Sequence, residues 1–435
     1  MQENITSWGR IFQETGDTSR PRSLQEIREV LKEGQKPLLP VGIGRSYGDS
    51  CIIKDGHHIR SLNLDRFLAF DRNTGILRCE AGVTLAQILQ VAVPAGFFLP
   101  VTPGTKFVTI AGAIANDVHG KNHYQDGTIG CHVTALHLIR SDGSEQVLTP
   151  EDNEELFRAT IGGLGLTGMI TWVELKLKKA SGYFHVENIR FENIDEFFKI
   201  AEESNKDWAY TVSWVDCLAK GEKLGRGIFM RGNHNESSHR ECKVTTVPKI
   251  GVPISFPDFA LNNTTIKIFN ELYFRKSPKL SVNREQHFEP FFYPLDIINN
   301  WNLIYGNRGF YQYQFVLPVH EKDTIVKIFE TIADSGQGSF LAVFKEFGSI
   351  PSPGMLSFPK PGYTLALDFA NLGSATTDLL NKLDDLVMPA GGALYPAKDG
   401  RMPPDVFRQS HPKLEEFVPY MDSAFASSFW KRVMC

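Results

Sequence analysis

Two glycine-rich stretches contain the residues best suited to chemistry. The first, GIGRSYGDS at 42–50, follows an apolar run and offers successive backbone N–H groups in a tight turn, which can bind a phosphate or pyrophosphate without side-chain charge. The second, residues 103–130, has small residues at 111–113 that let the backbone lie against a flat or anionic ligand. It continues into HGKN at 119–122, which adds donors and a cation. A purely structural loop would rarely combine these features.

A third glycine cluster lies at 161–168 and contains GxGxxG at Gly163, Gly165 and Gly168. It follows an expected helix and precedes an expected strand, which is the wrong order for a dinucleotide-binding βαβ unit. The 42–50 stretch also departs from that fingerprint, because its third glycine is displaced to Gly48. Neither cluster therefore predicts a nicotinamide dinucleotide fold.

The composition narrows the class of protein. A chain of 435 residues exceeds what one core usually holds, so two or three domains are expected. A net charge of -4, with 42% hydrophobic and 22% charged residues, is ordinary for a soluble globular protein and argues against nucleic acid as the main partner. The six cysteines lack metal-ligand or redox spacing, so free thiols and no metal site are expected.

The sequence also bears on where the protein works. The N-terminal residues have neither a basic nor an apolar signal-peptide region, and no run of 18 apolar residues occurs. These features predict a cytoplasmic protein.

The pattern of elements predicts an α+β protein with two domains. Residues 1–178 alternate helical and strand-like runs around the glycine-rich turns. Residues 179–390 contain alternating strands such as YTVSWVD and YQYQFVLPV, separated by amphipathic helices, which predicts an antiparallel sheet with helices on one face. A mobile insertion is expected at about 244–290. Residues 391–435 are expected to return to the first domain.

The three glycine clusters together resemble the flavin-binding half of the vanillyl-alcohol-oxidase-like, or PCMH-type, FAD oxidoreductases. Further motifs are similar to a narrower family within them, the decaprenylphosphoryl-ribose 2′-oxidases, the flavin subunits of an epimerase. These motifs are SWGR at 7–10, WNLIYGNRGFYQYQFV at 301–316, SFLAVFKEFG at 339–348, LSFPKPGY at 356–363 and LYPAKDGR at 394–401. The resemblance covers nearly the whole chain and implies a PCMH-type fold with an antiparallel-sheet substrate domain.

The resemblance implies a set of FAD-binding residues. The pyrophosphate would be wrapped by Gly42, Ile43, Gly44, Arg45, Ser46, Tyr47, Gly48 and Asp49. The isoalloxazine and the ribityl chain would be lined by Gly104, Thr105, Thr109, Gly112 and Ala113. The ring and substrate would lie near His119, Gly120, Lys121 and Asn122, the adenine end near Gly168 and Ile170, and Tyr395 would close the site.

The resemblance also implies catalytic and substrate-binding residues. The catalytic set is Lys398, His119, Lys121 and Tyr395, and the substrate-binding set is Gln312, Gln314, Lys345 and Tyr293. Oxidation of a secondary alcohol needs a hydride acceptor, a group that receives the hydroxyl proton and a cation for a phosphate, and flavin supplies the first. A neutral Lys398 could act as the base, whereas a charged one would favour the reduced, anionic flavin. Both alternatives stay open. Ordinary surface roles for Lys398, Lys345 and the two glutamines stay open as well.

Some residues depart from the family pattern. Arg45 stands where related flavoproteins carry the histidine that attaches FAD covalently, so non-covalent FAD is expected. Ala366 stands at the position of a thiol, and Thr364 stands where an amide side chain is usual. Because these positions face the substrate in the family, they leave the sugar specificity open.

The expected reaction is oxidation of the 2′-hydroxyl of a polyprenylphosphoryl-ribose to the 2′-keto form. The implied partners are the lipid-linked sugar phosphate, a short-chain NAD(P)H-dependent reductase and a quinone or other electron acceptor, with peripheral contact at the inner face of the membrane. In one interpretation Ile254, Phe256, Phe259 and Leu261 meet the lipid tail; in the other they pack on the second domain. Two alternative functions are an alditol or aldonolactone dehydrogenase acting on free sugars and a non-catalytic flavin-retaining assembly protein.

Overall fold

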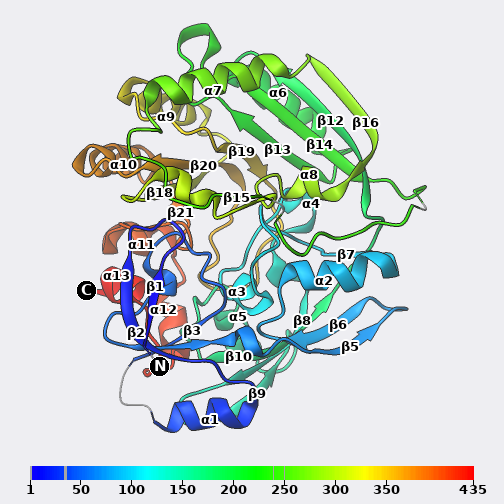
Figure 1. Ribbon diagram of the computed structural model, residues 1–435, viewed down its shortest axis with the longest axis vertical. Coiled ribbons are helices and arrows are strands. Elements are labelled where there is room, and N and C mark those ends of the chain that lie inside the picture. The colour runs from blue at the N-terminus through cyan, green and yellow to red at the C-terminus, as the bar shows by residue number, and fades with distance from the viewer. Residues whose placement is uncertain (1, 34–36, 239, 249) are drawn as a thin grey trace.

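The computed structural model describes residues 2–33, 37–238, 240–248 and 250–435. Its lower half in Figure 1 begins with a four-stranded sheet in the order β1-β2-β4-β3. Strands β2, β4 and β3 are parallel, and β1 is antiparallel to β2. The elements are β1 (Gln2–Thr6), β2 (Gln13–Ser19), α1 (Leu24–Lys32), β3 (Leu38–Val41) and β4 (His57–Arg60). Ser23 is the N-cap of α1, since its side chain accepts from the Glu26 N–H.

A second sheet in this half is antiparallel, in the order β5-β6-β10-β8-β9. Its strands are β5 (Phe67–Asp71), β6 (Ile76–Glu80), β8 (Val133–Ile139), β9 (Glu145–Leu148) and β10 (Met169–Lys176). Beside it lie α2 (Leu85–Ala92), α3 (Ile110–Ala115) and α5 (Glu154–Thr160), and β7 (Phe97–Phe98) pairs with β11 (Lys178–Lys179). Helix α4 (His123–Asp126) lies toward the upper half in Figure 1. Helix α2 begins with a capping box formed by Thr84 and Gln87.

The upper half in Figure 1 is built on an eight-stranded antiparallel sheet, in the order β16-β12-β14-β13-β19-β20-β18-β21. The strands are β12 (Tyr183–Phe191), β13 (Tyr210–Val215), β14 (Gly227–His234), β16 (Leu280–His287), β18 (Phe310–Leu317), β19 (Ala342–Phe347), β20 (Gly362–Ala370) and β21 (Ala393–Leu394). Helices α6 (Ile194–Ser204), α9 (Lys322–Ser335) and α10 (Ser374–Val387) bury their apolar faces with this sheet. The expected α+β architecture with a large antiparallel sheet is confirmed.

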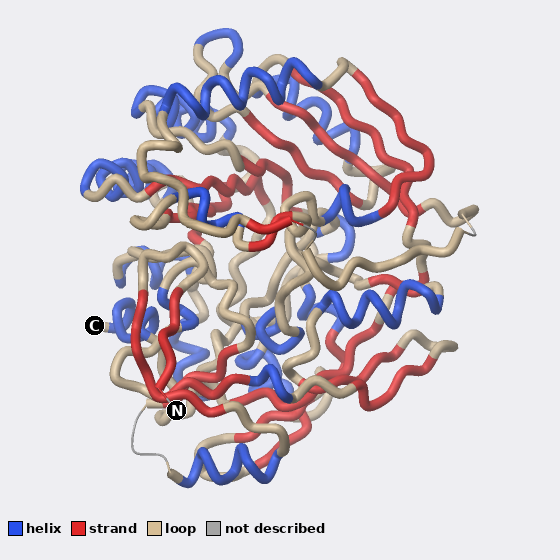
Figure 2. Tube along the Cα trace, viewed as in Figure 1, coloured by secondary structure: helices blue, strands red, loops and turns tan. Residues whose placement is uncertain are grey.

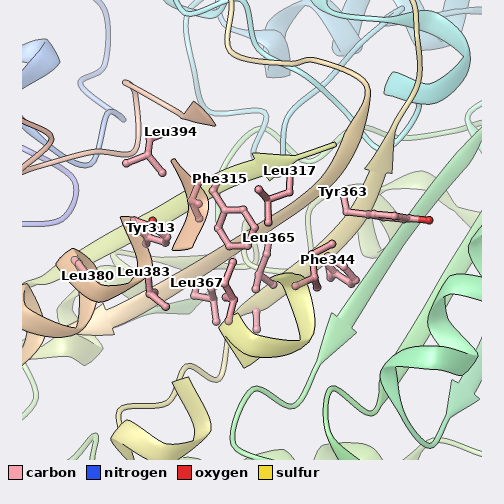
Figure 3. Close-up of a cluster of buried hydrophobic side chains, with 14 of the residues drawn as sticks. Tyr313, Phe315, Leu317, Phe344, Tyr363, Leu365, Leu367, Leu380, Leu383 and Leu394 are labelled. Atoms are coloured by element: carbon pink, nitrogen blue, oxygen red, sulfur yellow. The ribbon is translucent and has the colours of Figure 1, made fainter. Parts of the chain in front are cut away.

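The two faces of the large sheet differ because side chains alternate along each strand. Tyr313, Phe315, Leu365 and Phe344 are buried in the core shared with the helices, as Figure 3 shows. The residues between them in the sequence lie on the other face, which points toward the lower half. One face therefore stabilises the domain, and the other is available for a site.

The segment expected as an insertion, 244–290, contains regular elements. Strand β15 (Ile250–Gly251) pairs in parallel with β17 (Ile298–Asn299), and α7 (Asn263–Lys276) precedes the edge strand β16. Helix α8 (Phe288–Phe292) follows. None of the described helices is both long enough and apolar enough to span a bilayer.

The C-terminal residues return to the lower half. Helices α11 (Pro404–Ser410), α12 (Leu414–Phe417) and α13 (Ser428–Met434) lie near the first sheet in Figure 1. The Leu38 N–H donates to Ala424 O at 2.7 Å, and the Ala426 N–H donates to Leu38 O at 2.9 Å. Much of the chain between the two halves is loop, as Figure 2 shows. The predicted cofactor and catalytic residues lie mostly in loops and turns.

Candidate active site

The loop at 42–49 leaves backbone donors free. The N–H groups of residues 43–46 make no hydrogen bond within the described chain. Gly44 has a φ of +78°, and a Cβ placed there would meet nothing within 4 Å, so its backbone faces open space. A Cβ on Gly42 would lie 2.1 Å from the Thr109 hydroxyl oxygen, so the two glycine-rich stretches are in contact. Such a row of free N–H groups is suited to a pyrophosphate.

This loop is fixed from several directions. The Tyr47 N–H donates to Ala397 O at 3.0 Å, and the Trp8 N–H donates to Ser46 O at 2.9 Å. Arg45 lies over the Trp8 ring, 4.2 Å from its centre. Burial lowers the pKa of Arg45, opposed by the charge of Asp296. The guanidinium forms no ion pair with any described carboxylate.

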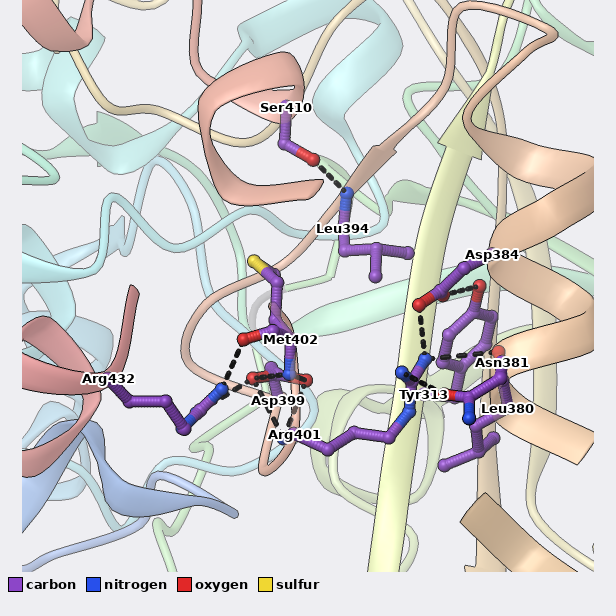
Figure 4. Close-up of polar contacts among 10 residues, drawn as sticks. All are labelled: Tyr313, Leu380, Asn381, Asp384, Leu394, Asp399, Arg401, Met402, Ser410 and Arg432. Atoms are coloured by element: carbon purple, nitrogen blue, oxygen red, sulfur yellow. Dashed lines mark hydrogen bonds and ion pairs between the residues drawn. The ribbon is translucent and has the colours of Figure 1, made fainter. Parts of the chain in front are cut away.

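The C-terminal segment also holds the loop through charge. Arg432 on α13 donates to Asp49 at 2.7 Å and to Asp399 at 3.0 Å. Asp399 also accepts from the Met402 N–H at 2.9 Å, as Figure 4 shows. A Cβ on Gly48 would lie only 1.6 Å from Asp399 O, so only glycine fits there. Asp49 is thus a structural anchor of the loop.

The stretch at 104–113 exposes its backbone to the same open space as the 42–49 loop. A Cβ on Gly104 would meet nothing within 4 Å. Thr109 is the N-cap of α3 and accepts from the Gly112 N–H at 3.3 Å, and Ala113 is buried. The Thr105 hydroxyl accepts from the Phe107 N–H at 3.1 Å.

Gly168 and Ile170, expected at the adenine end, lie at the start of β10. Ile170 is buried in a core that residues of both halves share. A Cβ on Gly168 would lie 2.7 Å from Ile139 O on β8, so this glycine allows close approach of a strand.

His119 is held as a neutral imidazole. The Gln314 amide donates to its Nε2 at 3.0 Å, so the proton is placed on Nδ1. Its ring lies 4.8 Å from that of Phe347 and 5.2 Å from that of Tyr395. Burial, and then the nearby charge of Lys345, lowers its pKa well below the ordinary value. The Nδ1–H has no acceptor within the described chain, so it is a donor for a ligand.

Lys121 and Lys345 are two lysines whose ammonium groups contact backbone carbonyls rather than carboxylates. Lys121 Nζ donates to Phe291 O at 2.6 Å, and Lys345 Nζ donates to Gly120 O at 2.5 Å. Burial lowers the pKa of each to about 7, and the charge of Lys121 adds to the shift of Lys345. Neither forms an ion pair with a described carboxylate. Such lysines are suited to an anion from outside the chain.

The site face of the large sheet is set by strand register. Gln312 pairs with Asp368 and Gln314 pairs with Ala366, across β18 and β20. Lys345 pairs with Thr364 across β19 and β20, so the polar residues of three strands share one face. The two departures from the family pattern, Ala366 and Thr364, lie on it. The side chain of Asn122 points away from this face, because its amide donates to Pro100 O at 2.6 Å and to Asp126 at 2.7 Å.

Tyr395 and Lys398 approach this face from the C-terminal segment. The Tyr395 hydroxyl donates to Asn116 O at 2.9 Å, and its ring stacks on Phe358 at 4.8 Å. Lys398 Nζ lies 4.1 Å from the centre of the Tyr47 ring. Burial lowers the pKa of Lys398 to about 8, opposed by the negative charge of Asp368. Lys398 is therefore close to changing protonation state near neutral pH.

Tyr293 differs from the other predicted substrate residues. Its hydroxyl shares a 2.6 Å hydrogen bond with Thr102, and the side chain is buried among Phe288 and Phe292. The structure therefore ties Tyr293 to the loop before Gly104 rather than to the face of the large sheet.

Asp368 is a residue of the site that the motifs did not single out. It is almost fully buried, and the Gln312 amide donates to its carboxylate at 2.5 Å. The signal was present in YTLALDF, where alternation puts Asp368 on the same face as Thr364 and Ala366.

These residues fit the expected FAD. The free N–H groups of the 42–49 loop and the open space at Gly44 and Gly104 suit a pyrophosphate and a flat ring. On the site face, the buried His119 Nδ1 and Gln312 Oε1 have no partner within the described chain. Buried polar atoms usually have a partner, so both atoms are suited to a ligand. The described residues contain no group of side chains arranged to hold a metal ion.

Comparison with known proteins agrees with this geometry. Residues 18–149 match the family model described as an FAD binding domain. The chain is 33% identical to decaprenylphosphoryl-beta-D-ribose oxidase of Mycolicibacterium smegmatis, over 99% of this chain and 97% of that protein. It is 28% identical to an uncharacterised protein of Streptomyces coelicolor, over 77% of this chain and 94% of that one. D-arabinono-1,4-lactone oxidase of Kluyveromyces lactis is 25% identical over 47% of this chain and 41% of its own length.

Proposed function

Because the chain belongs to the FAD-binding oxidoreductase family that contains decaprenylphosphoryl-beta-D-ribose oxidase, we propose that it oxidises a secondary alcohol of a lipid-linked sugar. The proposed substrate is a polyprenylphosphoryl-ribose, whose 2′-hydroxyl becomes a ketone. When bound, FAD supplies the acceptor for the hydride that leaves the carbinol carbon. The chain binds and orients the sugar and handles the hydroxyl proton.

The observation that carries this proposal is the polar face of the large sheet opposite the FAD loops. Gln312, Gln314 and Lys345 lie on that face, and Gln314 is bonded directly to His119 of the HGKN run. Residues from the expected cofactor half and the expected substrate half therefore meet at one place. A site at such a junction can hold a sugar between a flavin and an amide-rich surface.

The three lysines and His119 each have a role in this proposal. Lys121 and Lys345, without carboxylate partners, bind the phosphate of the substrate. His119 donates from Nδ1–H to an oxygen of the sugar or of the cofactor, because Gln314 occupies its other nitrogen. Lys398 lies nearest the reacting hydroxyl and either receives its proton or, as a cation, stabilises negative charge there.

We further propose that FAD is bound without a covalent link. Arg45, at the position where related proteins attach FAD through histidine, has a guanidinium that cannot form that bond. It stacks on Trp8 instead. Heating or acid treatment should therefore release all the flavin from the polypeptide, and flavin that stays with the denatured chain would contradict this.

The lipid-linked substrate implies contact with a membrane surface. The described part of segment 244–290 exposes large apolar side chains, including Phe259 at 78% and Ile254 at 72%, and α7 exposes Leu272 at 64%. Lys267, Arg275 and Lys276 lie on the same helix. Apolar and basic groups together favour an anionic lipid surface. Sedimentation with phosphatidylglycerol vesicles should exceed that with phosphatidylcholine vesicles, and it should fall in a Phe259→Ser, Leu272→Ser variant.

The other partners follow from the chemistry of the reaction. The 2′-ketone must be reduced on the opposite face to complete an epimerisation, which needs a short-chain NAD(P)H-dependent reductase. The reduced flavin must also be reoxidised, and a quinone or another acceptor is the proposed oxidant. The proposed place of work is the cytoplasmic face of the membrane.

Anaerobic bleaching of the flavin tests the proposed function. Decaprenylphosphoryl-ribose should bleach the purified holoprotein, whereas free ribitol and a free aldonolactone should not. Bleaching by ribitol or the lactone, and none by the lipid-linked sugar, would refute the proposal. That outcome would favour a second candidate, a dehydrogenase of free sugars, which the similarity to D-arabinono-1,4-lactone oxidase supports.

A further inference from the structure

Asp368 is a buried carboxylate that has no role in the reaction proposed above. It is only 1% exposed, on the site face of β20. One carboxylate oxygen accepts from the Gln312 amide at 2.5 Å, and the Tyr305 hydroxyl also interacts with the carboxylate. Neutral donors alone do not offset the cost of burying a carboxylate charge, so Asp368 needs a cation nearby.

The groups around Asp368 come from four elements. They are Gln312 of β18, Tyr47 of the 42–49 loop, Tyr305 of the turn before β18, and Lys398 of the C-terminal segment. Burial, followed by the charge of Asp368, raises the pKa of both tyrosines well above 10, so both stay neutral. Lys398 is the cation among these groups.

Tyr47 links the two charges. Lys398 Nζ lies 4.1 Å from the centre of its ring, and its hydroxyl interacts with the Gln312 side chain that holds Asp368. No described carboxylate is within ion-pair distance of Lys398. The ammonium thus lies over an aromatic face, within electrostatic range of the Asp368 carboxylate, and it remains free to contact a ligand.

We propose that Asp368 is a positioning residue for Lys398, and that its carboxylate keeps the lysine charged and held over the Tyr47 ring. This inference rests on the proposed function, because it gives Asp368 a task within the same site. It also selects between the two roles left open for Lys398. A lysine kept charged acts by electrostatic stabilisation in the resting enzyme and does not act as a base.

The pH range of this arrangement follows from the two groups. Burial raises the pKa of Asp368 to about 7, against the effects of Gln312 and Lys398. Asp368 is therefore neutralised as the pH falls below about 7, and Lys398 loses its proton as the pH rises above about 8. Both are charged between these values. His119 stays neutral throughout, since its pKa is far below this range.

The test is a pH titration of the visible absorbance of bound FAD in the full-length holoprotein, which needs no turnover. The wild-type flavin should show a step near pH 8 that disappears in Lys398→Met. In Asp368→Asn, which keeps an acceptor for Gln312, the step should move down by about one pH unit, because the opposing charge is lost. Asp368→Glu should restore it in part.

A matched control is Asp384→Asn. Asp384 is also buried, but it accepts from Tyr313 beneath the opposite face of the sheet. Its variant should leave the step in place. An unchanged step in Asp368→Asn, or a wild-type titration without a step that depends on Lys398, would overturn the inference. If no sugar bleaches the wild-type flavin, the proposed function fails, but the titration still decides the role of Asp368.

Discussion

The two lysines without anions predict a specific pH dependence of substrate binding. Burial lowers the pKa of Lys121 and of Lys345 to about 7. A lysine with a lowered pKa is cationic below that value, so affinity for a phosphate is fully present at low pH and is lost as the pH rises through 7. The KM for the lipid-linked sugar should therefore increase with pH.

The size of the effect follows from the fraction of lysine that is charged. With a pKa of about 7, roughly nine lysines in ten are protonated at pH 6 and one in ten at pH 8. Between these values KM should rise about tenfold if one lysine binds the phosphate and about a hundredfold if both do, or about 1.4 kcal/mol for each. The inhibition constant of a neutral sugar such as ribitol, which should not itself reduce the flavin, should not change in this way.

The assay is anaerobic flavin reduction by the lipid-linked sugar, alone and in competition with ribitol, from pH 6 to pH 9. Lys345→Met should raise KM for the lipid-linked sugar at low pH by about tenfold. It should also reduce the slope of log KM against pH by the contribution of one lysine. Lys360→Met is the control, because this partly buried lysine is also bonded to carbonyls, those of Gly391 and Gly392. A KM for the lipid-linked sugar that is flat between pH 6 and pH 8, or an equal pH slope for the inhibition constant of ribitol, would refute the reasoning.

Two further predictions concern the 42–49 loop. Gly48→Ala should reduce the FAD content of the purified protein severalfold, since the new methyl group would lie 1.6 Å from Asp399 O; Gly251→Ala, where the nearest atom is 3.9 Å away, should retain full FAD. Arg432→Met should lower the free energy of unfolding by about 3 kcal/mol, because it leaves the carboxylates of Asp49 and Asp399 buried without their cation. Chemical denaturation measures this loss, and a change below about 1 kcal/mol would contradict it.

The fold was largely predictable because its signals are local. The capping residues Ser23 and Thr84, and the alternating strands of the second domain, depend only on neighbours in sequence. The helix and edge strand within 244–290 were missed, because exposed apolar residues and asparagines hide the amphipathic pattern of α7. That helix exposes Ile268 and Leu272, where the usual pattern would bury them.

The site was predictable only in part, because its contacts are long-range. Alternation alone puts Gln312 and Gln314 on one face, and the structure adds that Gln314 meets His119, 195 residues away. No local pattern reveals that the charge of Asp368 acts on the pKa of Lys398, or that the hydroxyl of Tyr293 is hydrogen-bonded to Thr102. Motifs identify residues that can do chemistry, but the distances that pair them come from tertiary packing.

The anchoring of the 42–49 loop has a consequence for the order of folding. Asp49 is bonded to Arg432, 383 residues later in the chain, and Tyr47 is bonded to Ala397. During synthesis the cofactor loop is made early, but its anchors emerge only after the whole large sheet. Contacts of such wide sequence separation form late and slowly. The nascent first domain should therefore bind FAD poorly until the C-terminal segment has docked, so acquisition of the cofactor reports completion of the entire fold.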